Sequence, residues 1–153
     1  MKWEHPPLIK IYEALGVVAD DRIEVVGNTA KVYSSSRNKH YNVSYDSENS
    51  AIMANDNGSY WKGHLGYPSI AYLLKIGVLD YQPEMGEMMK DIAWKDINQK
   101  HKNDFDKTLA EILGSLTEEQ VKKLNKYVQY IDEEIKKLDL CFLGKKTQPP
   151  KGY

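Results

Sequence analysis

The sequence has little cysteine and little arginine. Cys141 is the only cysteine, so an intramolecular disulfide and a cysteine-based zinc site are both excluded. Arg22 and Arg37 are the only arginines, which counts against dedicated recognition of phosphates or bases by planar guanidinium groups. No apolar stretch approaches the roughly 20 residues that cross a bilayer, and residues 1–7 lack the apolar segment of a secretory signal. We therefore expect a soluble, cytoplasmic protein with no membrane association.

What the chain does contain is typical of one globular domain. It has 153 residues, of which 41% are hydrophobic and 28% charged, which is enough to bury a core without disulfides or metals. Its net charge of -1 supplies no global field that attracts polyanions. We expect a single domain over residues 1–143, sheet-rich in 1–79 and helical in 87–143, followed by a disordered tail at 144–153.

Alternating apolar and polar residues between 22 and 54 predict a sheet. Ile23 and Val25 alternate with polar neighbours, and Tyr41 and Val43 do so most clearly. Turn residues separate these short segments, which predicts an antiparallel meander of three to four strands. A helix ending at a Gly16 cap is expected before it, and a helix opening at Pro68 after it. The expected fold class is α+β.

The C-terminal half is dominated by one amphipathic helix. Thr117 and Gln120 have the spacing of a capping box that opens it. Residues 114–116 make a short connection to the preceding helical stretch, so we expect a helical hairpin. Whether residues 87–113 form one helix or two is open. The apolar positions recur at heptad spacing over three repeats: Val121, Leu124, Val128, Ile131, Ile135, Leu138 and Phe142.

The heptad seam supports two interpretations. It could be an interface formed by Leu124, Val128, Ile131, Ile135 and Leu138, since such a seam packs well against a facing helix. This predicts a non-catalytic interaction module that self-associates as a homo-oligomer or binds a protein partner. The alternative is packing within the chain, which the wider apolar face produced by neighbouring tyrosines favours.

The loop from 55 to 67 is a candidate ligand site. It concentrates polar and aromatic side chains between glycines before a helix N-terminus: Asp56, Ser59, Tyr60, Trp61 and His64. This predicts a small-molecule-binding protein or a small hydrolase-type enzyme, in which Asp56 orients His64 as a general base. The alternative places Trp61 in the core and His64 at the surface. No glycine spacing matches a phosphate-binding fingerprint, and no catalytic residue is assigned.

The histidines and lysines of the helical half give weaker signals. His101 and Asp104 share a helix face, but a third metal ligand is missing, so we predict no metal and no cofactor and expect His101 and Phe105 to be buried. Interleaved acidic residues neutralise the lysines of the last helix, which makes nucleic-acid binding a weak alternative.

The layout of residues 40–74 resembles a SWIM-type zinc finger. A hairpin is followed by an aspartate, a glycine-rich loop and a helix with Ile70 to Leu74. The resemblance implies a binding module rather than an enzyme. It implies no zinc site, because the positions that match the family's ligands are Ile52, Ala54, Tyr67 and Ser69.

Overall fold

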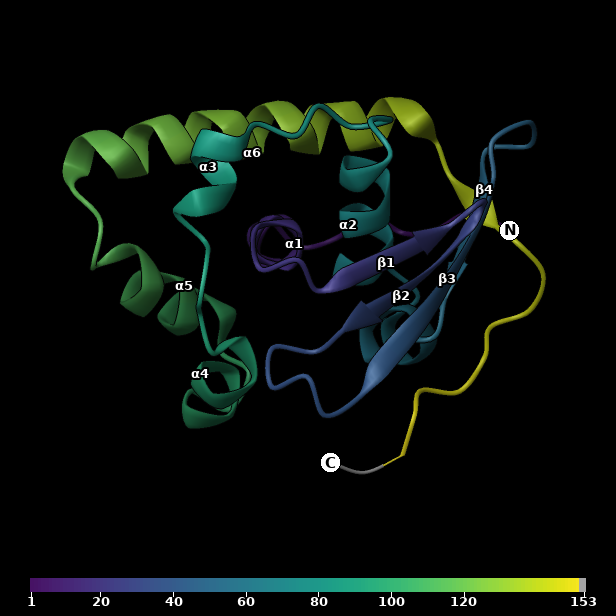
Figure 1. The fold of residues 1–153 in the computed structure, drawn as a ribbon, viewed down its shortest axis with the longest axis horizontal. Coiled ribbons are helices and arrows are strands. Elements are labelled where there is room, and N and C mark those ends of the chain that lie inside the picture. Colours follow the sequence, from purple (N-terminus) through teal and green to yellow (C-terminus); the bar gives the residue numbers. More distant parts are fainter. Residues whose placement is uncertain (152–153) are drawn as a thin grey trace.

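The computed structural model describes residues 1–151 and confirms the α+β fold (Figure 1). Its elements follow one another as α1 (Ile9–Ala19), β1 (Ile23–Val26), β2 (Thr29–Tyr33), β3 (His40–Asp46), β4 (Ala51–Ala54), the π-helix η1 (Gly58–Lys62), α2 (Tyr67–Lys75), α3 (Pro83–Glu87), α4 (Trp94–Lys100), α5 (Phe105–Leu113), α6 (Glu118–Leu138) and β5 (Cys141–Phe142).

The sheet has five strands, of which the first four form an antiparallel meander and the fifth comes from much later in the sequence. Strands β1 to β4 pair antiparallel in sequence order, as the alternating pattern predicts. Strand β5 then joins the outer edge of β4 in parallel, with Ala51 opposite Cys141. The sheet therefore has one strand more than the sequence predicts, because a two-residue strand has no periodicity to detect.

The N-terminal segment secures this added strand. The Trp3 amide donates to the Leu140 carbonyl at 3.1 Å, and the Trp3 indole donates to the Ile52 carbonyl at 2.8 Å. The Trp3 ring also packs on Phe142, with centroids 4.1 Å apart. Segments from both ends of the described chain thus meet at β4.

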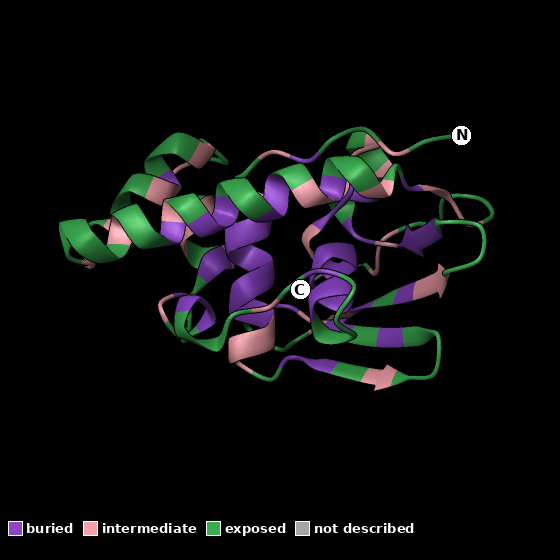
Figure 2. Ribbon diagram, turned by 90° about the horizontal axis from the view of Figure 1, so that it is seen from above, coloured by how far each residue is buried: buried purple, intermediate pink, exposed green. Residues whose placement is uncertain are grey.

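Helices α1 and α2 form the centre of the core. Their side chains are buried along most of their length, whereas α6 alternates between buried and exposed positions (Figure 2). The predicted helix end at Gly16 is wrong, since α1 continues to Ala19. A Cβ at Gly16 would lie 2.9 Å from the Met89 carbonyl oxygen, so glycine serves here for the close approach of two backbones.

Helix α6 begins with the predicted capping box. The Thr117 hydroxyl accepts from the Gln120 amide at 3.1 Å, and the Gln120 side chain accepts from the Thr117 amide at 2.9 Å. The heptad seam packs inside the same chain. Its exposed fractions, which decide between core and free surface, are 0% for Leu124, Val128 and Ile131 and 5% for Ile135, while Leu138 is half-buried.

The region between α2 and α6 is more broken than its apolar spacing indicates. Residues 87–113 contain two separate helices, α4 and α5, and Asp104 caps the second by accepting from the Lys107 amide. Residues 80–86, which follow α2, include the start of α3. Phe105 is half-buried rather than buried.

Two remaining expectations concern the C-terminal tail and the prediction of no membrane association. Residues 144–151 have no regular secondary structure, and the last two residues of the predicted tail lie outside the described part. Across residues 1–151, no helix has the length and apolarity required to cross a membrane.

Candidate functional site

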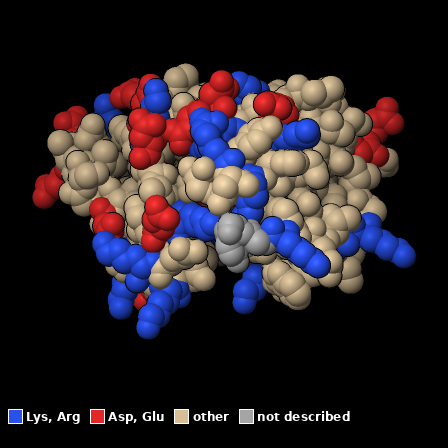
Figure 3. All heavy atoms as spheres, turned by 60° about the horizontal axis from the view of Figure 1, so that its bottom comes forward, with Lys and Arg blue, Asp and Glu red and all other residues tan. Residues whose placement is uncertain are grey.

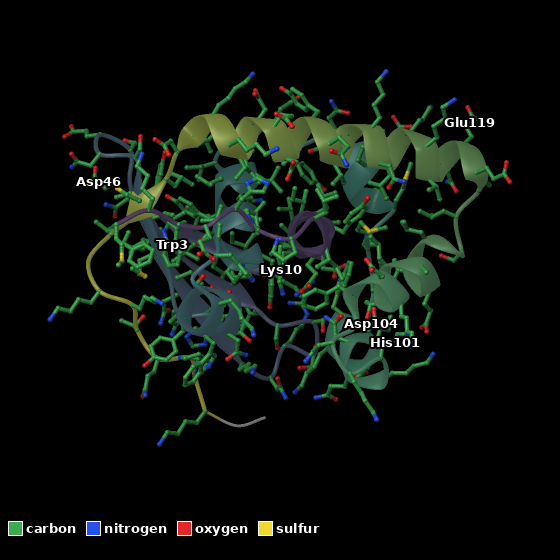
Figure 4. All side chains as sticks on the ribbon, turned by 180° about the vertical axis from the view of Figure 1, so that it is seen from behind. Trp3, Lys10, Asp46, His101, Asp104 and Glu119 are labelled. Carbon is green, nitrogen blue, oxygen red and sulfur yellow. The ribbon has the colours of Figure 1, made fainter. Side chains whose placement is uncertain are left out.

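A cleft of about 770 Å³ opens between α1, η1, the β2–β3 loop and the α4–α5 region. This volume lies within the range of small-molecule sites. Figure 4 shows Lys10 of α1 in the middle of the molecule and His101 and Asp104 together on the α4–α5 side. The cleft is lined by charged, aromatic and amide side chains, among them Glu13, Asp56, Tyr41, Tyr67, Trp94 and Asn98.

Asp56 is a buried carboxylate at this cleft. One carboxylate oxygen accepts from the Ser59 hydroxyl at 2.6 Å and the other from the Ser59 amide at 3.2 Å. Burial raises the pKa of Asp56, and the bonds from Ser59 and the charge of Lys10 oppose this shift. Gly66 leaves the room that the carboxylate occupies, since a Cβ there would lie 2.0 Å from Oδ2 of Asp56.

Glu13 of α1 is the second buried carboxylate. Lys10 Nζ lies 3.6 Å from its Oε1, an ion pair that is slightly longer than a hydrogen bond. Burial raises the pKa of Glu13; Lys10 and Arg22 lower it, and the charge of Asp56 raises it further. The charge of Asp56 therefore adds to burial in disfavouring the ionisation of Glu13.

Two tyrosines lie beside these carboxyl groups. The rings of Tyr41 and Tyr67 meet edge to face, with centroids 6.1 Å apart. Burial raises the pKa of Tyr41 to about 12, with further contributions from Asp56 and Glu13. Burial also raises the pKa of Tyr67 well above its usual value. Both phenols therefore stay protonated at neutral pH and are able to donate hydrogen bonds.

The predicted loop residues contribute unequally. Asp56, Trp61 and His64 line the cleft, while the buried Ser59 holds Asp56. Tyr60 packs against Trp61 with ring centroids 4.7 Å apart. The placement of Trp61 in the core is wrong, since its side chain is 68% exposed at the edge of the cleft.

The predicted orientation of His64 by Asp56 is not what the structure shows. His64 Nδ1 lies 3.1 Å from the Leu65 carbonyl oxygen, and a carbonyl oxygen can only accept, so this nitrogen donates. Asp56 directs its carboxylate to Ser59 instead. The carboxyl pair of Asp56 and Glu13, rather than an Asp–His pair, is the distinctive feature of the site.

Sequence reasoning missed Glu13 of α1 and Tyr41 of β3, which reach the cleft from other elements, and did not single out Tyr67 at the end of the predicted loop. One signal for Glu13 was present: it stands in a helix with Ile9 four residues before it and Val17 four residues after it. An acidic residue on an apolar helical face is either paired or functional.

At the two weaker candidate sites, around His101 and along the lysines of α6, the side chains form ion pairs with neighbouring glutamates. His101 Nε2 and Lys100 Nζ share the Oε1 atom of Glu111, at 2.9 and 2.6 Å. Within residues 1–151, no group of three or more histidine, cysteine, aspartate or glutamate side chains is arranged to hold a metal ion. Lys136 and Lys137 pair with Glu133 and Glu134 at 3.2 and 2.9 Å.

Comparison with known proteins places the chain in a family. Residues 3–141 match the family described as "Uncharacterised conserved protein UCP014422", and the chain belongs to it. No curated protein and no solved structure matches the sequence. The match spans both the cleft-lining segments and α6.

Proposed function

We propose that this protein binds a small molecule in the cleft and uses Asp56 and Glu13 as proton-donating or proton-accepting groups toward it. One observation carries the proposal: two buried carboxyl groups, distant in sequence, line the same cleft. Burying carboxyl groups opposes folding, and clefts that retain them with perturbed pKa values are favoured functional sites.

The surrounding groups support acid–base chemistry. A carboxyl group with a raised pKa exchanges protons closer to neutral pH than an exposed one does. The protonated Tyr41 and Tyr67 supply donors that orient a ligand, and Trp61 offers an exposed aromatic face at the entrance. These groups suit a protein that binds a small molecule, or a hydrolase-type enzyme in which a carboxyl group activates water.

The interaction function expected first from the sequence has weaker support. The seam of α6 is occupied by packing against its own chain, so self-association through Val128, Ile131 and Ile135 has no free surface to use. Homo-oligomer formation through another surface, and the cytoplasmic location, stay predictions.

The proposal is tested with a panel of metabolites screened by thermal shift and tryptophan fluorescence. Wild-type protein is compared with Asp56→Asn and Glu13→Gln, and with Glu24→Gln on the exposed side of β1 as the matched control. We expect at least one compound to bind the wild type and the control, and to bind both cleft variants at least tenfold more weakly. Equal binding by all four proteins would refute a ligand site at these carboxyl groups.

A further inference from the structure

We infer that the ligand of this cleft is an uncharged carbohydrate, whose sugar ring stacks on Trp61 at the entrance while its hydroxyl groups bond to unpaired polar atoms of the cleft. The inference rests on the proposed function and adds the chemical class of the ligand. A sugar ring combines the two properties that the cleft favours, an apolar C–H face and a rim of hydroxyl groups.

The exposure of Trp61 is the first support. Its side chain lines the cleft yet lies largely in solvent. Tryptophan offers a large, flat apolar surface, and aromatic side chains are prominent in small-molecule sites. An exposed face of this size forgoes the free energy that burial would give, and a ligand that covers it restores that free energy. Trp61 is therefore placed to contact the flat face of a ligand at the entrance.

The turn that carries Trp61 also holds the buried carboxylate. The Tyr60 amide donates to the Asp56 carbonyl oxygen at 3.0 Å, and the Ser59 hydroxyl donates to the Asp56 carboxylate. On the other side, the Lys146 ammonium donates to the Tyr60 carbonyl oxygen at 3.2 Å. The turn is the π-helix η1, and π-helical turns are rare and frequently lie at functional sites. The aromatic face and the carboxyl group are thus fixed relative to each other.

Unpaired polar atoms are the second support. Among the described residues, three that line the cleft have a buried polar atom without a hydrogen-bond partner: Oε1 of Glu13, Nε1 of Trp94 and Oδ1 of Asn98. Buried polar atoms are nearly always paired, so these atoms favour a ligand that supplies hydrogen bonds. One of the three is a donor, and an amide or carboxylate oxygen accepts. A hydroxyl group both donates and accepts, so a ligand rich in hydroxyl groups satisfies all three.

The pairing of charges inside the cleft favours an uncharged ligand. Two of the basic side chains that line it are paired with carboxylates of the same chain, Lys10 with Glu13 and Arg22 with Asp20. Arg22 also donates to the Tyr33 carbonyl oxygen at 2.8 Å. Figure 3 shows basic and acidic side chains on the same face of the molecule, with broad uncharged areas between them. Because these charges have partners within the chain, the ligand need not supply a counter-charge.

The test titrates four uncharged disaccharides, maltose, cellobiose, lactose and chitobiose, and follows backbone amide chemical shifts. We expect at least one of them to give saturable shifts confined to the cleft. Trp61→Ala should bind that disaccharide about tenfold more weakly, whereas Trp61→Phe, which keeps an aromatic face, should stay within about threefold of the wild type. The matched control Tyr130→Ala removes an exposed aromatic side chain from α6 and should bind like the wild type.

Two further measurements separate contact with the ligand from a structural role. Asn98→Ala removes one unpaired acceptor and should weaken binding of the same disaccharide about fivefold. Because Trp61 is largely exposed, Trp61→Ala should leave the Tm within about 2 °C of the wild-type value. A loss of affinity in this variant is then a loss of contact with the sugar ring and not a loss of folded protein.

The outcomes separate this inference from the proposed function. If no disaccharide binds saturably, or if Trp61→Ala and Tyr130→Ala weaken binding equally, the inference is overturned. Adenosine that binds about tenfold more tightly than every disaccharide also overturns it, since the ligand would then carry a flat aromatic base. A metabolite that binds through Asp56 and Glu13, with no disaccharide binding, overturns the inference and leaves the proposed function standing. Disaccharide binding that depends on Trp61 and Asn98, but is insensitive to Asp56→Asn and Glu13→Gln, counts against the proposed function alone.

Discussion

Replacing Ile131 by alanine distinguishes a core seam on α6 from an interface. Its side chain is fully buried within the protomer. The substitution removes three carbon atoms, each worth about 0.8 kcal/mol of transfer free energy, and leaves a cavity that adds to this. We expect the free energy of unfolding to fall by about 3 kcal/mol, within the roughly 2–5 kcal/mol typical of buried isoleucine truncations.

The measurement is urea unfolding followed by circular dichroism at two protein concentrations tenfold apart. For a chain of this size, the loss corresponds to a Tm about 6–12 °C lower. Glu133→Ala, on the exposed face of the same helix, should change the free energy of unfolding by less than about 0.5 kcal/mol. If the seam is core, the wild-type midpoint is independent of protein concentration.

A contrary result is equally clear. If Ile131→Ala leaves the free energy of unfolding of the protomer unchanged and instead abolishes a concentration dependence seen in the wild type, the seam is an interface. The packing described for α6 would then be refuted.

Three other substitutions test the cleft and the capping box. Gly66→Ala places a Cβ 2.0 Å from Asp56 Oδ2, so it should displace the carboxylate, lower the Tm and abolish ligand binding in the thermal-shift assay. Because burial raises the pKa of Asp56 above its unfolded value of 3.8, the folded state binds this proton more tightly, and wild-type stability should fall as pH rises from about 3.8 through the folded pKa. Urea unfolding of Asp56→Asn across this range should show a smaller fall, because Glu13 is then the only one of the two buried carboxyl groups that contributes to it; an identical pH profile would contradict the assigned shift. Thr117→Ala removes the side-chain acceptor that opens α6, and should cost about 1 kcal/mol in urea unfolding; no change would show that the cap contributes nothing.

The predictable parts of the fold are those with a local cause. The alternation around Tyr41 and Val43 identifies β3, because one face of the sheet is buried and the other is not. The Thr117–Gln120 spacing identifies the start of α6, because both hydrogen bonds form within one turn. Strand β5 depends instead on an edge supplied by distant residues, and its two residues carry no pattern of their own.

The residues of the candidate site also differ in whether a local sequence pattern predicts them. Asp56, Trp61 and His64 are found from the composition of a single loop, because they are close in sequence. Glu13 and Tyr41 join them only because α1 packs against α2 and α2 in turn contacts the sheet, an arrangement that no local pattern encodes. The exposure of Trp61 was mistaken for burial because a large aromatic side chain is usually buried, whereas here it borders a cleft.

The pairing of β5 with β4 has a consequence for the order of events during synthesis. Cys141 donates its amide to the Ser50 carbonyl across a separation of 91 residues. The ribosome makes β4 long before β5, so the outer edge of β4 is unpaired while α2 to α6 are being added. Unpaired strand edges are where nascent chains associate wrongly. Strand β5 can pair with β4 only after residues 141–142 have been made, so the edge of β4 is open to other strands throughout that interval.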